Sequence, residues 1–532
     1  MKKLQNYIVS NKTNLVITLL LIFSIYSALI IGQAWDEGYH LKHGKVTFNY
    51  LLSFGLINEK LEMRDQYSSM YFTLKYFITS FFPYQFKTEV GHLINLSLSW
   101  GSLFGFSKIG KIIFNKEIGK ICFLILFFYP IFFGHMAVNG SDSVLLFCNI
   151  WITYYVLKYL KNHHKTEKCK KYIILIGIIC ALGTGIQKVF LGSLLPLIIL
   201  TIVDVFFAKV FLKNEIKFTK FIKDFILSFL VFYFILVLFW IDAHNDIFLF
   251  PIKSLLSTFS DNFWTGWAYN VLNGEYFFSN NAPKYYLIIS LLLKSPEYFL
   301  FLFIFFIPLV FLKKNFFVEI FKNFNYKIFF VGGIIIFPHI ILIFIPYPIY
   351  DGLRLFMWSI PYICFIPSLS IYYLINNIKF ISSKIISSIV MVLFIIFICN
   401  FILITPYQYT YLNYLNGDLS KGYQKFENDY WGTSLKELVK KSSFNKSKEL
   451  KFSICGFSEE LVKKYLKNKY KNIKFVRLKD AEYIIMTNRT VYKEIDLKSN
   501  EFISNCFIEN KGIDIYEVKR NNLTLSTIRE LE

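Results

Sequence analysis

The stretch Trp35-Asp36-Glu37-Gly38-Tyr39-His40-Leu41-Lys42-His43 follows directly on an uncharged apolar run at 15–34. Two adjacent carboxylates are costly to place where a membrane helix ends. They could simply mark the aqueous end of the span, or they could belong to a functional site. The second interpretation is favoured because we expect another acid, a rare arginine and a docking surface on the same side of the membrane.

The composition excludes a soluble chain. Of the 532 residues, 55% are hydrophobic and 20% aromatic, and the mean hydropathy is +0.46. Apolar runs of roughly 20 residues, enough to cross a bilayer, recur along most of the chain. The net charge of +22 comes from lysines in short loops and in the C-terminal tail. This pattern is typical of membrane topology and anionic lipid headgroups rather than of nucleic-acid binding.

About eleven membrane-spanning helices are predicted from these runs. They are 15–34, 90–107, 120–137, 143–160, 172–186, 189–209, 222–241, 286–312, 328–346, 355–377 and 384–404. With the N-terminus in the cytoplasm and the first run an uncleaved span, the lysine-rich loops all fall on the cytoplasmic side. The segment 67–82 is short and contains Lys75, so we expect it, with 38–66, to form helices on the outer surface. Residues 172–209 are expected to form a helical hairpin that turns at Gly183-Thr184-Gly185.

Two domains follow from this topology. Residues 1–405 form the membrane domain, with outer loops at 35–88 and 242–285, and residues 406–532 form a small soluble α/β domain. In the second domain, strands are predicted near 451–455, 473–477 and 483–486, and helices at 434–441 and 459–466. Cys455 and Cys506 lie in it and could pair outside the cytosol, although spacing alone does not show this.

Acidic residues supply the first part of a candidate site. Asp36 and Glu37 follow the first span, and Asp142 lies at the tip between two later spans. The alternative role of Asp142 is to cap the helix that follows it.

Basic residues supply the second part. Arg354 and Arg64 are the only arginines before Arg477, and both fall on the expected outer face. The planar guanidinium fork suits bidentate binding of phosphate or carboxylate, whereas Arg354 could instead pair with Asp351 three residues away. Lys294 is a further cation near the headgroups, unless its side chain simply snorkels to water.

These groups suggest acid–base chemistry on a lipid phosphate. An aspartate could deprotonate an acceptor hydroxyl while cations stabilise a phosphate leaving group. If 36–43 is helical, Asp36, His40 and His43 share a face and could bind a divalent metal, although two histidines and one acid do not complete a site.

Five motifs in order along the chain resemble the GT-C glycosyltransferases, nearest to bacterial relatives of the protein O-mannosyltransferases and the lipid A aminoarabinose transferases. They are Trp35-Asp36-Glu37; residues 130–142, which end in Asp142; Leu272-Asn273-Gly274-Glu275-Tyr276 with Pro283, Tyr286 and Ser295-Pro296; Tyr350-Asp351-Gly352-Leu353-Arg354 with Pro361; and Pro406-Tyr407-Gln408-Tyr409 with Asp429-Tyr430-Trp431-Gly432-Thr433-Ser434.

The resemblance implies a polyprenyl-phosphate sugar donor and an inverting transfer on the outer face of a bacterial cytoplasmic membrane. It implies Asp36 as the base, Glu37 and Asp142 beside it, and the donor phosphate near Arg354. From their charge and expected position, Lys294, Arg64 and Lys188 are further candidate contacts of the donor phosphate or lipid. The chain departs from its relatives at Ser141, which is often lysine, and at Lys188, which is often arginine.

Two other functional classes remain open. A transporter or flippase of lipid-linked sugars or anions should carry ionisable groups at mid-membrane, often paired between two halves, whereas these acids gather at one face. A membrane anchor for a sugar-binding tail would leave Asp36 and Asp142 unexplained. The sugar and the acceptor are not specified by the sequence.

Overall fold

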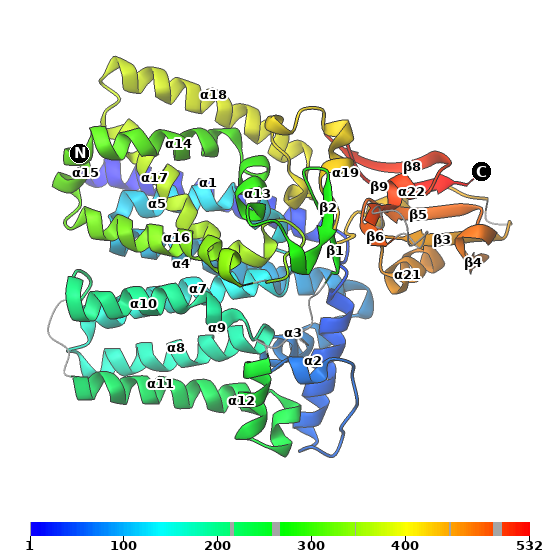
Figure 1. The fold of residues 1–532 in the computed structure, drawn as a ribbon, viewed down its shortest axis with the longest axis horizontal. Coiled ribbons are helices and arrows are strands. Elements are labelled where there is room, and N and C mark those ends of the chain that lie inside the picture. The colour runs from blue at the N-terminus through cyan, green and yellow to red at the C-terminus, as the bar shows by residue number, and fades with distance from the viewer. Residues whose placement is uncertain are drawn as a thin grey trace.

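The computed structural model describes residues 2–212, 218–257, 267–345, 347–445, 448–492 and 503–531. A bundle of helices occupies most of the molecule, and a sheet domain lies at one end of it (Figure 1). The helices before residue 242 are α1 (Lys2–Ile30), α2 (Glu37–Leu52), α3 (Met70–Ser80), α4 (Lys87–Ile113), α5 (Lys116–Phe127), α6 (Pro130–His135), α7 (Asp142–Asn162), α8 (Thr166–Ile186), α9 (Phe190–Ser193), α10 (Leu195–Val203) and α11 (Phe218–Leu238).

The later helices complete the bundle and enter the sheet domain. They are α12 (Leu249–Leu256), α13 (Tyr286–Lys294), α14 (Glu297–Leu312), α15 (Lys314–Ile320), α16 (Phe324–Phe344), α17 (Ile360–Asn376), α18 (Ile381–Leu403), α19 (Gly422–Lys425), α20 (Leu435–Lys441), α21 (Glu459–Lys469) and α22 (Cys506–Glu509).

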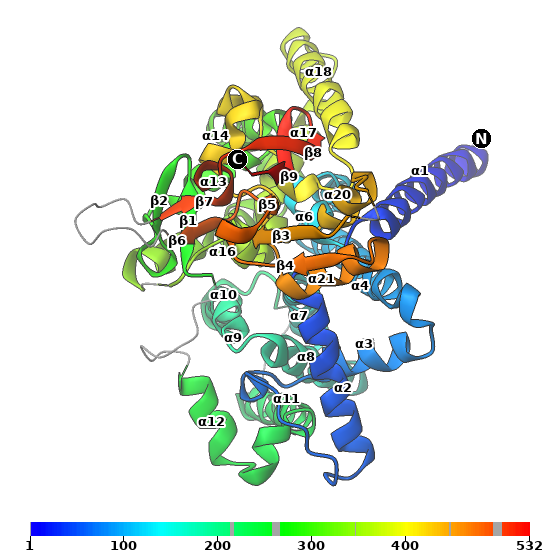
Figure 2. The ribbon, with the colours of Figure 1, turned by 90° about the vertical axis from the view of Figure 1, so that its right-hand side faces the viewer.

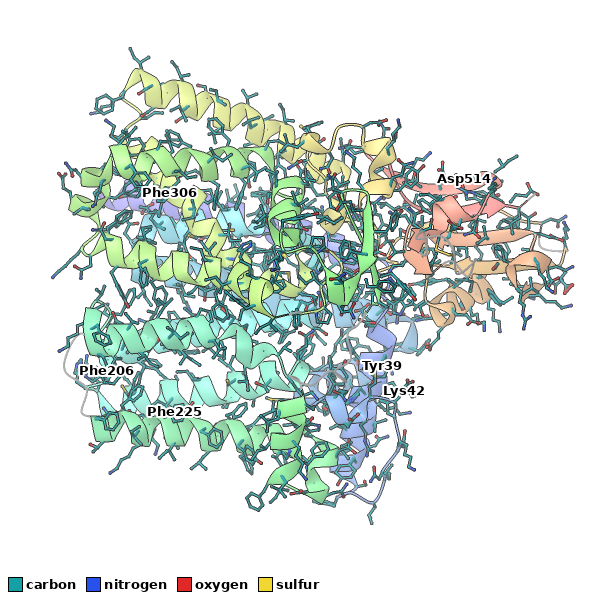
Figure 3. All side chains as sticks on the ribbon, in the orientation of Figure 1. Tyr39, Lys42, Phe206, Phe225, Phe306 and Asp514 are labelled. Carbon is teal, nitrogen blue, oxygen red and sulfur yellow. A yellow bond between two sulfur atoms is a disulfide. The ribbon has the colours of Figure 1, made fainter. Side chains whose placement is uncertain are left out.

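Eight helices of the described chain are long and apolar enough to cross a membrane, or nine if the bent pair α13–α14 is one span. The predicted run at 90–107 lies in α4, and the run at 120–137 is divided between α5 and α6. The span at 354–376 is central, with 83% of its apolar window buried, whereas α11 and α18 are peripheral, with 11% buried. Side chains such as Phe206 and Phe225 project from the surface of the bundle (Figure 3), as expected where lipid replaces water. The predicted fold class, a polytopic helical protein with a small C-terminal α/β domain, is confirmed, whereas the predicted count of about eleven spans is not reached by the eight or nine helices of the described chain that meet the criterion.

Short elements gather at one end of the bundle. The helices α2, α3 and α12 and the hairpin of β1 (Tyr269–Leu272) and β2 (Glu275–Phe278) lie at the end that carries the sheet domain (Figures 1 and 2). The helix start near residue 2 lies at the opposite end (Figure 1). The 38–66 and 67–82 segments therefore contain short helices, α2 and α3, rather than a further long apolar helix.

The turn of the 172–209 hairpin is not where the sequence predicted it. Helix α8 continues through Gly183 and Gly185 and ends at Ile186. A Cβ atom at Gly183 would overlap the Phe190 ring, and one at Gly185 would overlap the carbonyl oxygen of Ser68. Both glycines therefore serve close packing inside a helix rather than a tight turn.

The sheet domain is built on a five-stranded sheet in the order β4-β3-β5-β9-β8. Its strands are β3 (Leu450–Cys455), β4 (Ile473–Phe475), β5 (Tyr483–Thr487), β8 (Ile513–Arg520) and β9 (Leu523–Glu530), and β6 (Thr490–Tyr492) pairs separately with β7 (Ile503–Asn505). The pairings β4–β3, at one edge, and β3–β5 are parallel, and α21 connects β3 to β4. The three predicted strands and two predicted helices are present, while β6 to β9 were not predicted.

A disulfide joins Cys455, at the end of β3, to Cys506, at the start of α22. This settles the pairing that spacing left open. The bond links residues 51 positions apart. It joins the end of a strand in the parallel part of the sheet to the chain that precedes the antiparallel strands β8 and β9.

We predict that replacing both cysteines, Cys455→Ala with Cys506→Ala, destabilises the sheet domain by about 2–5 kcal/mol, because the unfolded chain regains the freedom of a long loop. Thermal unfolding of the purified protein in detergent, followed by protease sensitivity of the 406–532 region, measures the effect. Cys399→Ala, an exposed and unpaired cysteine in α18, is the control and should leave the unfolding temperature unchanged. Equal stability of the double variant and the wild type would contradict the prediction.

Candidate functional site

Asp36 lies at the entrance to α2 with its carboxylate uncommitted. It is the N-cap residue of α2 but makes no side-chain capping bond, and within the described chain no hydrogen bond or ion pair engages its side chain. Burial raises the pKa of this carboxyl, Arg354 opposes that shift, and Asp351 adds to it. A carboxylate with a raised pKa is a better proton acceptor than an exposed one, as base catalysis requires.

Glu37 points away from this position. Its Oε2 accepts hydrogen bonds from the Ala34 backbone N–H at 2.9 Å and from His92 Nε2 at 3.0 Å, and Lys75 Nζ lies 3.5 Å from Oε1. Burial would raise the pKa of Glu37, but His92 and Lys75 outweigh it and hold the pKa below its ordinary value. Glu37 thus fastens the start of α2 to α3 and α4, and its predicted place beside Asp36 in catalysis is not what its contacts indicate.

Asp142 and Arg354 meet at the same end of the bundle. Arg354 Nε lies 3.2 Å from Asp142 Oδ2, and Nη1 lies 2.9 Å from Asp351 Oδ2. Asp142 is the first residue of α7 rather than its N-cap, which is Ser141, so the capping alternative is wrong. The alternative pairing of Arg354 with Asp351 is present, but it coexists with the contact to Asp142. Arg354 is therefore held between two carboxylates from different parts of the chain, and its Nη2 has no partner within the described residues.

Aromatic rings connect Arg354 to the Asp36 segment. The guanidinium lies 4.4 Å from the centre of the Trp431 ring, and the Trp35 backbone N–H donates to the Trp431 carbonyl at 3.0 Å. Gly32, just before this segment, leaves no room for a Cβ against the Thr433 carbonyl oxygen. The chain after the last span therefore packs directly on the chain after the first, which places Asp36 close enough to Arg354 for their charges to interact.

Lys294 ends α13 and is buried, with 3% of the residue exposed. Its Nζ lies 4.9 Å from the centre of the Phe426 ring, and a Cβ added to Gly352 would stand 3.1 Å from it. No hydrogen-bond acceptor engages Nζ within the described chain. The side chain does not snorkel to solvent, so the lysine presents a buried charge that a bound anion could neutralise.

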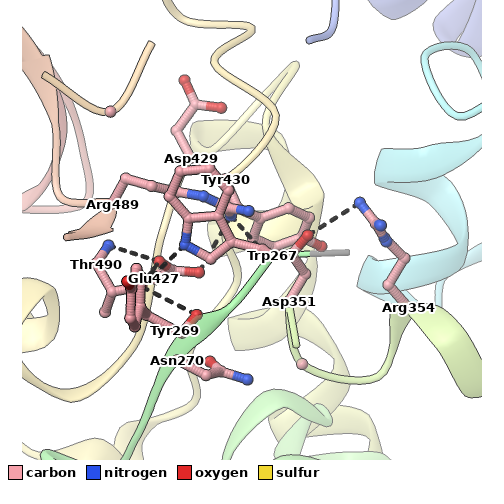
Figure 4. Close-up of polar contacts among 12 residues, drawn as sticks. Trp267, Tyr269, Asn270, Asp351, Arg354, Glu427, Asp429, Tyr430, Arg489 and Thr490 are labelled. Atoms are coloured by element: carbon pink, nitrogen blue, oxygen red, sulfur yellow. Dashed lines mark hydrogen bonds and ion pairs between the residues drawn. The ribbon is translucent and has the colours of Figure 1, made fainter. Parts of the chain in front are cut away.

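Two charged residues of the site were not predicted. Arg489, which lies between β5 and β6, reaches Asp351 Oδ1 with Nη1 at 2.5 Å and Glu427 Oε2 at 3.1 Å (Figure 4). Glu427 Oε1 also accepts from the Thr490 backbone N–H at 2.6 Å. The rarity of arginine beside lysine is a signal that also extends to Arg489, whereas nothing in the spacing of Glu427 indicates that it is buried.

A series of hydrogen bonds connects Asp142 to His135 and Tyr430. Asn139 Nδ2 donates to Asp142 Oδ2 and to His135 Nδ1, each at 2.8 Å. Because His135 Nδ1 is thus an acceptor, its Nε2–H is the donor to Tyr430 Oη at 2.8 Å. The motif at 130–142 is thereby tied to the motif at 429–434.

Four predicted residues lie in other contacts. Arg64 pairs with Asp242 at 2.6 Å, and Lys188 Nζ donates to Gln66 Oε1 at 2.8 Å and to Ser254 Oγ at 3.0 Å. The His40 ring stacks on Phe72 with 4.3 Å between ring centres, and His43 Nδ1 contacts Ser69 Oγ. Within the described part of the chain, no group of three or more His, Cys, Asp or Glu side chains could hold a metal ion, so the suggested metal set with Asp36 is not formed.

The charges of the site nearly balance. Asp142, Asp351 and Glu427 oppose Arg354, Arg489 and Lys294, and an ionised Asp36 would be in excess. Burial of Asp142, Asp351, Arg354 and Arg489 makes each pairing stronger than at a surface and makes any unpaired charge costly. The arrangement thus offers one uncommitted carboxylate beside cationic nitrogens that lack acceptors.

Comparison with models of known protein families finds no match, and neither does comparison with curated protein sequences. Among solved structures, the apo state of ArnT from Cupriavidus metallidurans is similar, with a TM-score of 0.50 and 8% identity over 98% of each chain. ArnT bound to undecaprenyl phosphate gives 0.49 and 10% over 98% of each chain. The apo oligosaccharyltransferase of Archaeoglobus fulgidus gives 0.41 and 11%, over 88% of this chain and 69% of that one. At these identities the likeness concerns the fold alone, and the apo ArnT match shows that this chain shares the fold of that structure.

We predict that Glu37→Gln destabilises the protein by about 3–5 kcal/mol, because it leaves Lys75 and His92 without their buried carboxylate. The folded-state pKa of Glu37 lies below its ordinary 4.5, so its contribution is complete above pH 4.5 and is lost as the pH falls through the folded-state pKa. Thermal unfolding in detergent at pH 7 and pH 4 measures both effects. Glu59 is exposed and lies in the segment between α2 and α3, so Glu59→Gln should behave as wild type. Equal behaviour of the two variants would contradict the role of Glu37.

Proposed function

We propose that this protein is a membrane glycosyltransferase that moves a sugar from a polyprenyl-phosphate donor to an acceptor hydroxyl, with inversion and with Asp36 as the general base. Asp36 takes the proton of the acceptor hydroxyl as its oxygen attacks the anomeric carbon. The bond from that carbon to the phosphate oxygen breaks, and the lipid phosphate leaves with the electron pair. Arg354 Nη2 and Lys294 Nζ stabilise the charge that the phosphate gains.

The observation that carries this proposal is the pairing of an uncommitted carboxylate with uncommitted cations. Within the described residues, no hydrogen bond or ion pair engages the carboxylate of the half-buried Asp36, and none engages Arg354 Nη2 or Lys294 Nζ. The phosphate of a lipid-linked sugar would pair with the two cations, and the hydroxyl of an acceptor would donate to Asp36. Asp142 is the second acid of the proposal, and its contact with Arg354 suits a positioning role.

The position of the site supports a lipid-linked donor. The site lies at the end of the bundle that carries the sheet domain, where the spans end (Figures 1 and 4). A phosphate headgroup reaches this level while its polyprenyl chain stays among the lipids. The lysine distribution supports a cytoplasmic N-terminus, which would put the site and the sheet domain on the outer side of a bacterial cytoplasmic membrane. The shared architecture with ArnT is in agreement with this, as a likeness of fold.

A transporter or flippase of lipid-linked sugars or anions is the alternative. Broken or charged helices near mid-membrane, related between two halves, would support it. The site described above instead joins residues of the membrane bundle to residues of the sheet domain at one end. This favours chemistry on a headgroup over passage through the bundle.

We predict that Asp36→Asn lowers sugar transfer by about 10²–10⁴-fold, because the amide cannot accept the proton. Transfer of labelled sugar from polyprenyl-phosphate donors, in membranes with equal amounts of each variant, is the measurement, and Glu59→Gln is the matched control. Binding of undecaprenyl phosphate by Asp36→Asn should remain at the wild-type level or rise, since a negative charge near the phosphate is removed.

Equal transfer by Asp36→Asn and wild type would remove Asp36 from the mechanism and leave Asp142 as the candidate base. Movement of lipid-linked sugar across vesicles, with no transfer from any donor, would overturn the glycosyltransferase proposal in favour of the transporter.

A further inference from the structure

We infer that Arg489 of the sheet domain is a positioning residue of the donor-phosphate site, which it completes by holding Asp351 and, through Asp351, Arg354. This inference rests on the proposed function, and it adds that the soluble domain is part of the site rather than an appendage to it. The phosphate would be bound by groups of the membrane domain whose placement depends on a residue more than 100 positions further along the chain.

The contacts of Arg489 leave its side chain little freedom. The residue is 5% exposed, its Nη1 contacts both Asp351 and Glu427, and the guanidinium lies 4.5 Å from the centre of the Trp267 ring (Figure 4). A planar group held by two carboxylates and one ring face has a defined orientation, which a surface ion pair does not have.

Asp351 is the residue of the membrane domain that Arg489 contacts. It has a φ of +57° and Gly352 follows with +69°, so two consecutive residues adopt the left-handed conformation. That conformation is uncommon for a residue with a side chain and persists where surrounding contacts fix it. Arg489 holds Oδ1 and Arg354 holds Oδ2, while Gly352 donates its backbone N–H to Tyr286 Oη at 2.8 Å.

The same turn sets the position of both proposed phosphate-binding cations. Arg354 follows it directly, and Gly352 lies against the Lys294 amine, as the 3.1 Å approach of a notional Cβ shows. A shift of the Asp351 turn would therefore move Arg354 and change the surroundings of Lys294 together. Displacements of the order of 1 Å in groups that hold a substrate are enough to weaken binding or catalysis strongly.

The segment that carries Arg489 is itself fixed. The Cys506 backbone N–H donates to the Arg489 carbonyl at 3.1 Å, and Cys506 is bonded to Cys455. A Cβ at Gly456, next to Cys455, would stand 2.7 Å from Arg489 Cβ and 3.2 Å from Cys506 Sγ. Glu427 binds the next residue, Thr490, through its backbone N–H. The disulfide and Glu427 thus brace the backbone on the two sides of Arg489.

Charge gives a second reason for the role. Loss of Arg489 removes one positive charge from the site while the carboxylates of Asp351 and Glu427 remain. Asp351 would then pair with Arg354 alone. The site would become more negative and the free nitrogen of Arg354 less available to a phosphate. We therefore expect loss of Arg489 to act on donor binding more than on the chemical step.

The test compares Arg489→Gln and Arg489→Lys with wild type in detergent-solubilised full-length protein. The first measurement is the dissociation constant for undecaprenyl phosphate, and the second is KM and kcat for sugar transfer. We expect Arg489→Gln to weaken binding and raise KM by about tenfold or more, with a smaller change in kcat, because truncating a buried charge pair is costly. Arg489→Lys, which keeps the charge but not the fork, should restore part of the loss.

A matched control separates this role from simple docking of the domain. Arg520 of β8 also joins the sheet domain to the end of the membrane domain, through Nε to the Thr405 carbonyl at 3.2 Å, and it pairs with Glu437 at 2.5 Å, away from the site. Arg520→Gln should change the dissociation constant and KM by less than about twofold, as expected for a polar contact outside the site. Equal effects of Arg489→Gln and Arg520→Gln would overturn the inference.

A second variant keeps the test decisive if Arg489→Gln does not fold. The double variant Arg489→Gln with Glu427→Gln removes both members of the Arg489–Glu427 ion pair. No carboxylate at position 427 is then left buried and unpaired. This pair should fold and still bind undecaprenyl phosphate about tenfold more weakly, since Asp351 has lost its partner. If the double variant binds undecaprenyl phosphate with wild-type affinity, the role of Arg489 is overturned and the proposed function is unaffected. If the wild type itself does not bind the lipid phosphate, the proposed donor class is overturned together with the role of Arg489.

Discussion

The buried chain of charges from Asp142 through Arg354, Asp351 and Arg489 to Glu427 is the constraint on which the rest of the structure depends. Its members come from the first residue of α7, the turn after α16, the segment before α20 and the segment after β5. Each ion is tolerable in the interior only because its partners are present. The sheet domain and the bundle must therefore meet in one relative position, or several buried charges are left without partners.

Packing at the end of the bundle beside the sheet domain holds these charges in place. The segment after α1 presses on the segment at 431–433, where Gly32 permits the close approach and Trp431 covers Arg354. The Glu37 carboxylate binds His92 and Lys75 and so fixes the start of α2. Asp36, at the same helix start, has no hydrogen-bond or ion-pair partner within the described chain. Two adjacent acids thus have opposite roles because one is fully satisfied and the other is not. Neither role can be assigned from the dipeptide alone.

The sequence could predict what depends on composition and local pattern. The apolar runs gave the helices, the lysine bias gave one consistent end for the outer segments, and alternation in the tail gave β3 and β5. Asp36, Asp142, Arg354 and Lys294 were identified because acids, a rare arginine and a lysine at span ends are costly unless used. His40, Arg64 and Lys188 satisfied the same criterion, yet the structure pairs them with Phe72, Asp242 and Gln66. Proximity to a membrane surface selects candidates but does not show where their side chains point.

What could not be predicted are contacts between residues far apart in the chain. Arg489 and Asp351 are separated by 138 positions and Arg489 and Glu427 by 62, and no local pattern reports either distance. One physical signal does extend to them. In a chain that uses lysine for nearly all its cations, an arginine indicates a place where geometry and not only charge is required. Arg354 contacts carboxylates of another segment and of the turn before it, and Arg489 contacts Asp351 across the junction of bundle and sheet. Arg520 crosses the same junction through the Thr405 backbone carbonyl. These three arginines thus lie where the two parts of the molecule must hold one geometry, which is also what a site at their junction requires.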